Sequence, residues 1–336
     1  MATGTTKYGD ISPRTAAYAV RQFLEHARPI LVLERFATPY PIPKNKGQTV
    51  KLRRPIPFTP KTAPLVEGVT PTPTALRYED VTVNLLQYGD WSELTDVIQD
   101  THEDPVLNHM VMLHGENAGA TREQVLYGIL KAGTTVFYAN KVASRSNVVD
   151  VVQLSDIRRV VRYLRAQKAK FVTRILDGSV RIGTQPIEAS FIAICHTDLE
   201  HDIRSIAGFV PVAQYGSRRV VSEHELGTVE NVRFIISPEL APWADAGGTT
   251  GAGTTRVSTG GTNVDVYPIL IFGQDAYATT PLRGASSAEI MVINPNKPEK
   301  SDPLGQRGSV AWKTWFAGAI TNQTWIARLE VAATLV

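Results

Sequence analysis

The sequence predicts an α+β fold in which a proline-rich extended segment precedes two helices, a mixed region and a closing pair of strands. Residues 39–73 contain nine prolines, which remove backbone donors and fix φ, so this segment is neither a helix interior nor a central strand. Apolar residues recur at helical spacing over 104–133 and 155–168. From residue 186 onward, short apolar runs separated by turn residues are typical of strands.

Composition and charge narrow the class of protein. The chain has 336 residues, of which 43% are hydrophobic and 20% are charged, as in an ordered globular protein. A net charge of +3 is too weak by itself to indicate nucleic-acid binding. Cys195 is the single cysteine and lies in the apolar run FIAIC, which predicts an inert buried thiol. No signal-peptide pattern or apolar run of about 20 residues occurs, so we expect a soluble protein made in a reducing cytoplasm, without a membrane span.

The first part of the chain predicts a polar arm over residues 1–38 and a two-stranded ribbon over 39–90. Val81, Val83 and Leu85 alternate as one face of a strand after the prolines. An isolated two-stranded ribbon is marginal in water, so the ribbon needs another surface to lie on. A disordered proline-rich linker is the alternative.

Two helices are expected next. Asp104 and Pro105 suit the start of the first helical segment, which runs to Gly133. This segment is either one bent helix or two helices. Val106, Met110 and Leu113 lie on one of its faces. Ser155 is the expected N-cap of the second, DIRRVVRYLRAQKAK. Its polar face forms a basic stripe, which is either a solvated face or a contact for a polyanion: Arg158, Arg159, Arg162, Arg165 and Lys168.

The remainder reads as strands, one flexible loop and a closing hairpin. Residues 247–261 contain six glycines and predict a flexible glycine- and threonine-rich loop rather than a phosphate-binding loop. Near the end, 308–316 and the alternating residues from Trp325 read as two strands of one hairpin joined at TNQ. The tryptophans Trp312, Trp315 and Trp325 then supply buried area in a sheet.

No residue pattern predicts catalysis. His196 and His201 are five residues apart, not the four that place two imidazoles on one helix face, and no nucleophile, cofactor or metal motif occurs. We therefore expect no enzyme activity, no cofactor and no metal site. A metal-dependent hydrolase using His196, His201 and Glu200 stays as the alternative from another class.

The closing segment DPLGQRGSVAWKTWFAGAITNQTWIARLE resembles the major capsid proteins of tailed bacteriophages, whose shared fold is named after phage Hong Kong 97. LYGILKAGTTVFYA is also similar to the family's region after its long helix. The most specific part is a Gly-Gln-Arg-Gly turn followed by a Trp-Lys strand. The residues that carry this signature are Asp302, Pro303, Gly305, Gln306, Arg307, Gly308, Trp312 and Lys313.

The resemblance implies a role for each region. Residues 1–38 would form the N-terminal arm and 39–90 the extended loop that lies across a neighbouring subunit. Residues 91–185 would form a peripheral domain that holds the long spine helix and the basic helix. Residues 186–284 would form the axial domain, with the loop 247–261. Residues 285–336 would return to the peripheral domain as a closing β-hairpin.

The resemblance further implies a structural subunit that assembles into pentamers and hexamers of an icosahedral head around double-stranded DNA, held by non-specific contact. On this basis the basic stripe would face DNA. The candidate inter-subunit loop residues are Lys44, Lys46, Lys51, Arg53, Arg54 and Phe58. Nothing in the sequence places a loop lysine for the covalent cross-link that some members form.

The resemblance also allows portal and decoration proteins as partners. Scaffolding, if used, would be a separate protein, because a ribbon that begins near residue 39 leaves no room for an N-terminal scaffolding region. The protein would reside in the virion after assembly in the bacterial host cytoplasm. The shell protein of a cellular nanocompartment, which encloses an enzyme, is the alternative with the same fold.

Overall fold

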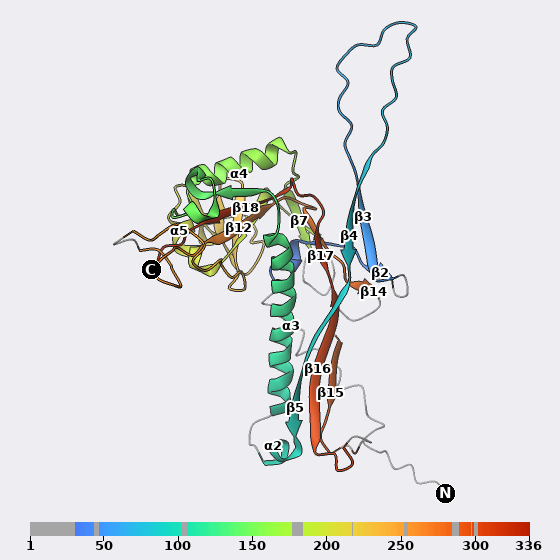
Figure 1. The fold of residues 1–336 in the computed structure, drawn as a ribbon, viewed down its shortest axis with the longest axis vertical. Helices are drawn as coiled ribbons and strands as arrows, with labels where there is room; N and C mark the ends of the chain where they lie inside the picture. The colour runs from blue at the N-terminus through green and yellow to red at the C-terminus, as the bar shows by residue number, and fades with distance from the viewer. Residues whose placement is uncertain are drawn as a thin grey trace.

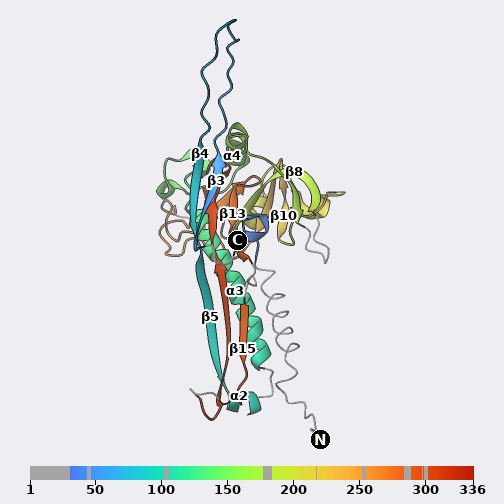
Figure 2. The ribbon, with the colours of Figure 1, turned by 90° about the vertical axis from the view of Figure 1, so that its right-hand side faces the viewer.

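A computed structural model describes residues 31–43, 47–101, 106–176, 184–216, 218–251, 255–283, 289–296, 298 and 302–336. Its described residues form three parts, which Figures 1 and 2 show along one long axis. A body contains the largest sheet, a stalk built on a long helix descends from it, and a ribbon projects at the opposite end of the axis.

An eight-stranded sheet forms the centre of the body. Its order is β6 (Val136–Tyr138), β18 (Ile326–Val331), β12 (Tyr267–Phe272), β8 (Thr184–Cys195), β11 (Val232–Ile236), β10 (Glu225–Val229) and β9 (Phe209–Pro211), with β7 (Val172–Leu176) paired to β8. All residues of β12 and β18 are buried, because both faces of the sheet are covered. A strand that is buried on both faces reads as a continuous apolar run, and this explains why β12 was recognisable in the sequence.

The two faces of this sheet carry different elements. Along β8, Ala193 and Cys195 pack in the core beneath α4 (Leu154–Ala166) and α5 (Glu200–Arg204). The alternate residues Ile192 and Ile194 pack in a second core with α3 (Val106–Lys131). Successive strand residues point to opposite faces, so α4 and α3 lie on opposite sides of the sheet.

The stalk pairs α3 with a three-stranded sheet of order β15 (Glu289–Ile293), β16 (Arg307–Phe316) and β5 (Leu86–Thr95). Val111 and Ala118 of α3 pack against Trp312, whose indole Nε1 donates to Asn117 Oδ1 at 3.2 Å. The helix is continuous and not split in two. The predicted face was partly wrong, because Leu113 is 63% exposed while the face that includes Val111 is buried. A short helix that the sequence analysis missed, α2 (Asp96–Thr101), precedes α3.

The ribbon consists of β3 (Thr49–Pro55) and β4 (Tyr78–Asn84), which pair antiparallel with Val50 opposite Val83. This confirms the ribbon interpretation for these segments. At its base, Val83 and Leu85 pack with Ala317 and Ala319. Smaller elements complete the fold: β1 (Thr38–Pro39), β2 (Ile42–Pro43), β13 (Tyr277–Thr279), β14 (Leu282–Arg283), β17 (Gly318–Ile320), η2 (Glu34–Phe36), η3 (Ala139–Lys141), η4 (Arg145–Asn147), η5 (Thr197–Leu199) and η6 (Val212–Gln214). The predicted arm helix lies outside the described residues.

The prediction that the two closing strands form one hairpin is wrong. β16 pairs with β15 and β5 in the stalk, whereas β18 pairs with β12 and β6 in the body. The residues between them, including β17 and TNQ, carry the chain from one sheet to the other. The two strands are close in sequence, but each has its apolar side chains in a different core, and burial decides the pairing.

The basic helix was expected in the same domain as the spine helix. α4 packs on the eight-stranded sheet, on the face opposite α3, with Ile157, Val160 and Leu164 in the core that includes β18. Its N-cap is Gln153, without a side-chain capping bond, and the predicted cap Ser155 lies inside the first turn. The helix ends at Ala166, and Lys168 follows in the left-handed conformation at φ 56°.

The glycine- and threonine-rich loop is folded where it is described, and not a flexible insertion there. Asp245 Oδ1 accepts the backbone N–H of Gly260 at 2.9 Å, and Asp265 Oδ2 accepts the Thr259 hydroxyl at 2.7 Å. Burial alone would raise the pKa of Asp265, but the bonds from Thr259 and the Asp245 backbone outweigh it and lower that pKa. A Cβ on Gly260 would meet Asp245 Oδ2 at 2.3 Å, so glycine here makes room for a carboxylate.

Candidate assembly surfaces

The tip of the ribbon exposes apolar side chains. Residues 56–77 continue beyond β3 and β4, and the chain reverses where Val69 N–H donates to Val66 O at 3.2 Å, with Gly68 at φ 77°. The exposed apolar residues are Ile56, Phe58, Leu65, Val66, Val69, Leu76 and Tyr78. A segment this apolar and this far from either core is typical of a contact surface.

The candidate loop residues have different roles in the ribbon. The Arg53 guanidinium donates to Asp80 Oδ1 at 2.8 Å across the strands, and this bond lowers the pKa of the Asp80 carboxyl. Arg54 pairs in the same way with Glu79. These two arginines therefore stabilise the strand pairing, whereas Lys51 and Phe58 are exposed. Lys44 and Lys46 lie outside the described residues.

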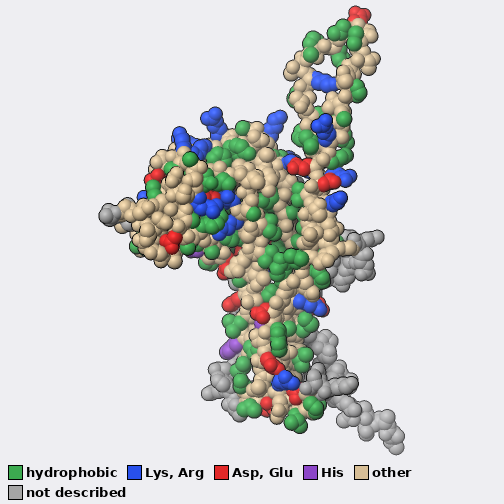
Figure 3. Space-filling model, in the orientation of Figure 1, with side chains coloured by type: hydrophobic (Ala, Val, Ile, Leu, Met, Phe, Trp, Pro, Cys, Tyr) green, Lys and Arg blue, Asp and Glu red, His purple; other side chains and the backbone are tan. Residues whose placement is uncertain are grey.

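Part of the predicted basic stripe lines an open hollow beside α4. Arg158, Arg162 and Arg165 contribute to its wall together with Arg218, Glu188 and Glu230, and the hollow has a volume of about 710 Å³. Figure 3 shows Lys and Arg side chains gathered at this edge of the body. Arg159 does not belong to the stripe, because it donates to Tyr138 O and pairs with Asp156 at 3.5 Å. Lys168 is exposed beyond the helix end.

The signature residues build a turn at the start of β16. The Asp302 carboxylate accepts Arg307 N–H at 2.9 Å, and Asp302 O accepts Gly305 N–H at 3.1 Å. Gly305 has φ 65°, a conformation that favours glycine. Pro303 and Gln306 are parts of this turn, and Lys313 pairs with Glu289 across the strands at 3.4 Å.

Replacing Gly308 by alanine should destabilise the subunit by about 1–3 kcal/mol, because overpacking forces the backbone to move. A Cβ there would meet Pro295 Cδ at 2.5 Å and Ile293 O at 2.8 Å. Gly128→Ala in α3 is the matched control, since nothing lies within 4 Å of its Cβ. Urea unfolding should show Gly128→Ala neutral or stabilising by about 0.5–1 kcal/mol. Equal stability of the two variants would refute the packing argument.

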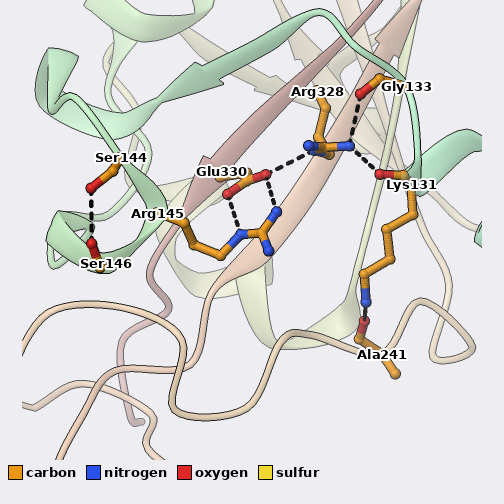
Figure 4. Close-up of polar contacts among 8 residues, drawn as sticks. All are labelled: Lys131, Gly133, Ser144, Arg145, Ser146, Ala241, Arg328 and Glu330. Atoms are coloured by element: carbon orange, nitrogen blue, oxygen red, sulfur yellow. Dashed lines mark hydrogen bonds and ion pairs between the residues drawn. The ribbon is translucent and has the colours of Figure 1, made fainter.

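A buried charge cluster joins the stalk to the body (Figure 4). The Glu330 carboxylate is fully buried and accepts Arg145 Nε at 2.7 Å and Arg328 Nε at 2.8 Å. The Arg328 guanidinium also donates to Gly133 O at 3.1 Å and to Lys131 O, the carbonyls at the C-terminal end of α3. Arg328 therefore caps the long helix from β18.

Other groups complete this cluster. The guanidinium of Arg145 lies 3.7 Å from the ring centroid of Trp243, and Lys131 Nζ lies 4.0 Å from it. Burial, and then the charges of Arg145 and Arg328, lowers the pKa of Lys131. The sequence analysis missed this cluster. Its signal was the occurrence of Arg328 and Glu330, two residues apart, inside an otherwise apolar strand.

A second buried carboxyl anchors the last part of the predicted arm, residues 31–38. Glu123 of α3 is fully buried, and Leu33 N–H donates to its two oxygens at 2.8 and 3.1 Å. Beside it, Arg122 pairs with Glu34, and the Tyr277 hydroxyl donates to Leu33 O at 2.6 Å. Burial raises the pKa of Glu123 to about 8, which the backbone bonds only partly oppose.

Ionisation of Glu123 should therefore weaken the fold as pH rises. The folded-state pKa of about 8 lies above the ordinary 4.5, so between these values the folded chain holds a proton that the unfolded chain has released. The stability that protonated Glu123 gives to the folded state is fully present below the unfolded pKa. It is lost as pH rises through the folded pKa. Urea unfolding from about pH 5 to 8.5 should show wild type losing stability relative to Glu123→Gln. Parallel curves for the two proteins would contradict this assignment.

Two of the three residues proposed for a hydrolase, His196 and Glu200, have structural partners. His196 Nδ1 accepts Asp198 N–H at 3.1 Å, and Glu200 Oε1 accepts Arg204 Nε at 2.8 Å. Within the described ranges, no group of three or more His, Cys, Asp or Glu side chains could hold a metal ion. Cys195 is fully buried, and burial raises the pKa of its thiol. None of the helices described here combines the length and apolar content needed to span a membrane.

The described surfaces are thus an apolar projecting ribbon and a charged open edge, on a fold held together by a buried charge cluster. A family model described as phage capsid protein matches residues 78–329. The chain therefore belongs to the phage capsid protein family, as the sequence resemblance implied. A curated relative, the major capsid protein of Pseudomonas phage KPP21, is 21% identical over 267 residues, covering 75% of this chain and 67% of the relative.

Solved capsid structures share the fold. The capsid of Ralstonia phage GP4 matches with a TM-score of 0.66 at 12% identity, covering 99% of both chains. The capsid of cyanophage Pam1 matches with a TM-score of 0.61 at 13% identity, covering 92% of both chains. The SrpI encapsulin of Synechococcus elongatus matches with a TM-score of 0.50 at 11% identity, covering 98% of this chain and 91% of the encapsulin. The predicted Hong Kong 97-type α+β fold is confirmed.

Proposed function

We propose that this chain is the major structural subunit of a tailed-phage head, in which pentamers and hexamers close an icosahedral shell around double-stranded DNA. The family assignment supports a capsid protein. The observation that carries self-assembly is the ribbon tip, where Leu65 is 78% exposed and Val66 is 68% exposed within a single chain. These side chains gain burial only on another molecule, and a shell supplies a neighbouring copy to every ribbon.

The ribbon and the buried cores have different roles in such a subunit. Packed cores fix the body and the stalk, while the ribbon projects from them and is held at its base by Val83 and Leu85. A shell needs the same chain in rings of five and six, and adjustable peripheral contacts allow this. Each contact is modest, but multivalency makes the closed shell stable. We propose that portal, scaffolding and decoration proteins are separate chains, with assembly in the host cytoplasm before release in virions.

Electron microscopy of the purified chain, with light scattering for mass, tests this proposal. Closed polyhedral particles or uniform rings of five or six are the expected result. A chain that stays monomeric both when purified and in infected cells, where any separate scaffolding protein is present, would contradict it. Particles from infected or expressing cells then identify the cargo, since nuclease-protected double-stranded DNA supports a phage head. An enclosed enzyme would support the nanocompartment alternative, which the encapsulin likeness keeps as the second candidate.

A further inference from the structure

The outer face of α4 carries more positive charge than the chain itself neutralises. In the hollow, Arg158 pairs with Glu230 at 2.6 Å and Arg218 pairs with Glu188 at 3.0 Å. Arg162 and Arg165 line the same hollow, and no carboxylate among the described residues lies within ion-pair distance of either. Two adjacent unpaired guanidinium groups at an open, partly walled surface attract an anionic partner.

The opposite side of the body offers carboxylates. Glu223 is exposed in the turn before β10, and Glu239 follows β11. Their neighbours Val221 and Leu240 pack in the core on the α3 side of the sheet, so both loops lie on that side. Glu239 accepts Gln124 Nε2 of α3 at 2.9 Å, and no described cation forms an ion pair with Glu223 or Glu239.

The position of α4 indicates which partner meets it. In the view down the shortest axis, α4 lies at the rim of the body and not on its broad face, and the ribbon extends toward the same end of the long axis (Figures 1 and 2). If the proposed shell is one subunit thick and the subunit lies flat in it, the short axis crosses the wall. Packaged DNA then meets a broad face, and the rim meets the next subunit. The ribbon and α4 are therefore directed to the same neighbour.

We propose that the basic face of α4, centred on Arg162 and Arg165, binds the acidic side of a second copy at the loops that hold Glu223 and Glu239. This inference rests on the proposed shell function and names one contact of that shell. α4 and these loops lie on opposite faces of the eight-stranded sheet. The contact therefore joins the α4 side of one copy to the α3 side of the next copy. Such a heterologous contact closes rings, which a self-complementary contact cannot do.

Charge reversal on α4, followed by compensating charge reversal on the acidic loops, tests this contact. Arg162→Glu with Arg165→Glu should lower the fraction of chain in DNA-free shells or rings by about tenfold or more, because like charges then face each other across the contact. Adding Glu223→Lys and Glu239→Lys to the same chain should restore assembly. Reversal of Lys141 and Lys170, exposed cations that do not line the hollow, is the matched control and should assemble like wild type.

The outcomes separate this inference from the proposed function. Wild type that assembles neither when purified nor in infected cells overturns the shell function itself. Wild-type shells together with normal assembly of Arg162→Glu/Arg165→Glu overturn the α4 contact, and loss of DNA alone in that variant would assign the stripe to DNA. Circular dichroism and urea unfolding check that each variant is folded. The milder Arg162→Gln/Arg165→Gln pair should weaken assembly in the same direction if the reversed chain fails to fold.

Cysteine cross-linking detects the contact itself, and a folding defect would not produce the same covalent multimers. Arg162→Cys and Glu239→Cys in one chain place thiols on opposite sides, and the native thiol Cys195 is buried. A short bismaleimide reagent added to assembled particles should give a ladder of covalent multimers beyond the dimer. Each single-cysteine variant should give none of this ladder. Assembled particles of the double variant that yield only monomer would refute the head-to-tail contact.

Discussion

Replacing Leu65, Val66 and Val69 together by serine is expected to abolish shell formation while leaving the subunit folded. In the single chain these side chains are 62–78% exposed and touch neither core, so their loss changes little in folding stability. On a neighbouring copy, each buried apolar side chain of this size contributes about 1.5–3 kcal/mol. The loss is repeated at every subunit of a shell, so the fraction assembled should fall to background.

Sedimentation and electron microscopy of matched concentrations measure this effect, with urea unfolding as the folding check. Thr70→Ser with Thr72→Ser is the control, because it alters the same segment and leaves its apolar side chains in place. Shells of normal yield from the triple serine variant would show that the ribbon tip is not an assembly surface. A triple variant that also unfolds more easily would show that the tip packs on its own subunit.

Replacing Glu330 by alanine should give the largest loss of subunit stability, about 3–5 kcal/mol, because it leaves the buried Arg328 guanidinium, and the partly exposed Arg145 beside it, without their shared carboxylate. The exposed fractions are 8% for Arg328 and 0% for Glu330. Without the carboxylate, Arg328 also loses the orientation that caps the end of α3. The stalk and body should therefore separate as cooperative units before the whole chain unfolds.

Urea unfolding followed by tryptophan fluorescence detects this loss, since Trp243 stacks on the cluster. Glu289→Gln is the control, because its pair with Lys313 spans 3.4 Å between side chains that are 56% and 40% exposed. Such an exposed pair contributes about 0–1 kcal/mol. If the two variants lost similar amounts of unfolding free energy, burial of Glu330 would not be the reason for its contribution to stability.

Local signals in the sequence determined much of the fold. Nine prolines excluded a regular core element over 39–73, and alternation at Val81, Val83 and Leu85 placed a strand whose inner face is buried at the ribbon base. Helical spacing placed both long helices, and apolar runs located β8, β11 and β12. The Gly-Gln-Arg-Gly signature indicated the family. These features depend on φ restrictions and side-chain periodicity, which act within a few residues.

The tertiary structure alone decided which elements pair and which charges meet. β16 and β18 looked like one hairpin, yet each joins a different sheet because its apolar face completes a different core. Charge by itself grouped Arg159 with the stripe, but packing turns it toward Tyr138 O, while Arg218, far away in sequence, enters the hollow. Glu330 and Arg145 meet across 185 residues of chain. Long-range burial and desolvation set these partners, and no local pattern encodes them.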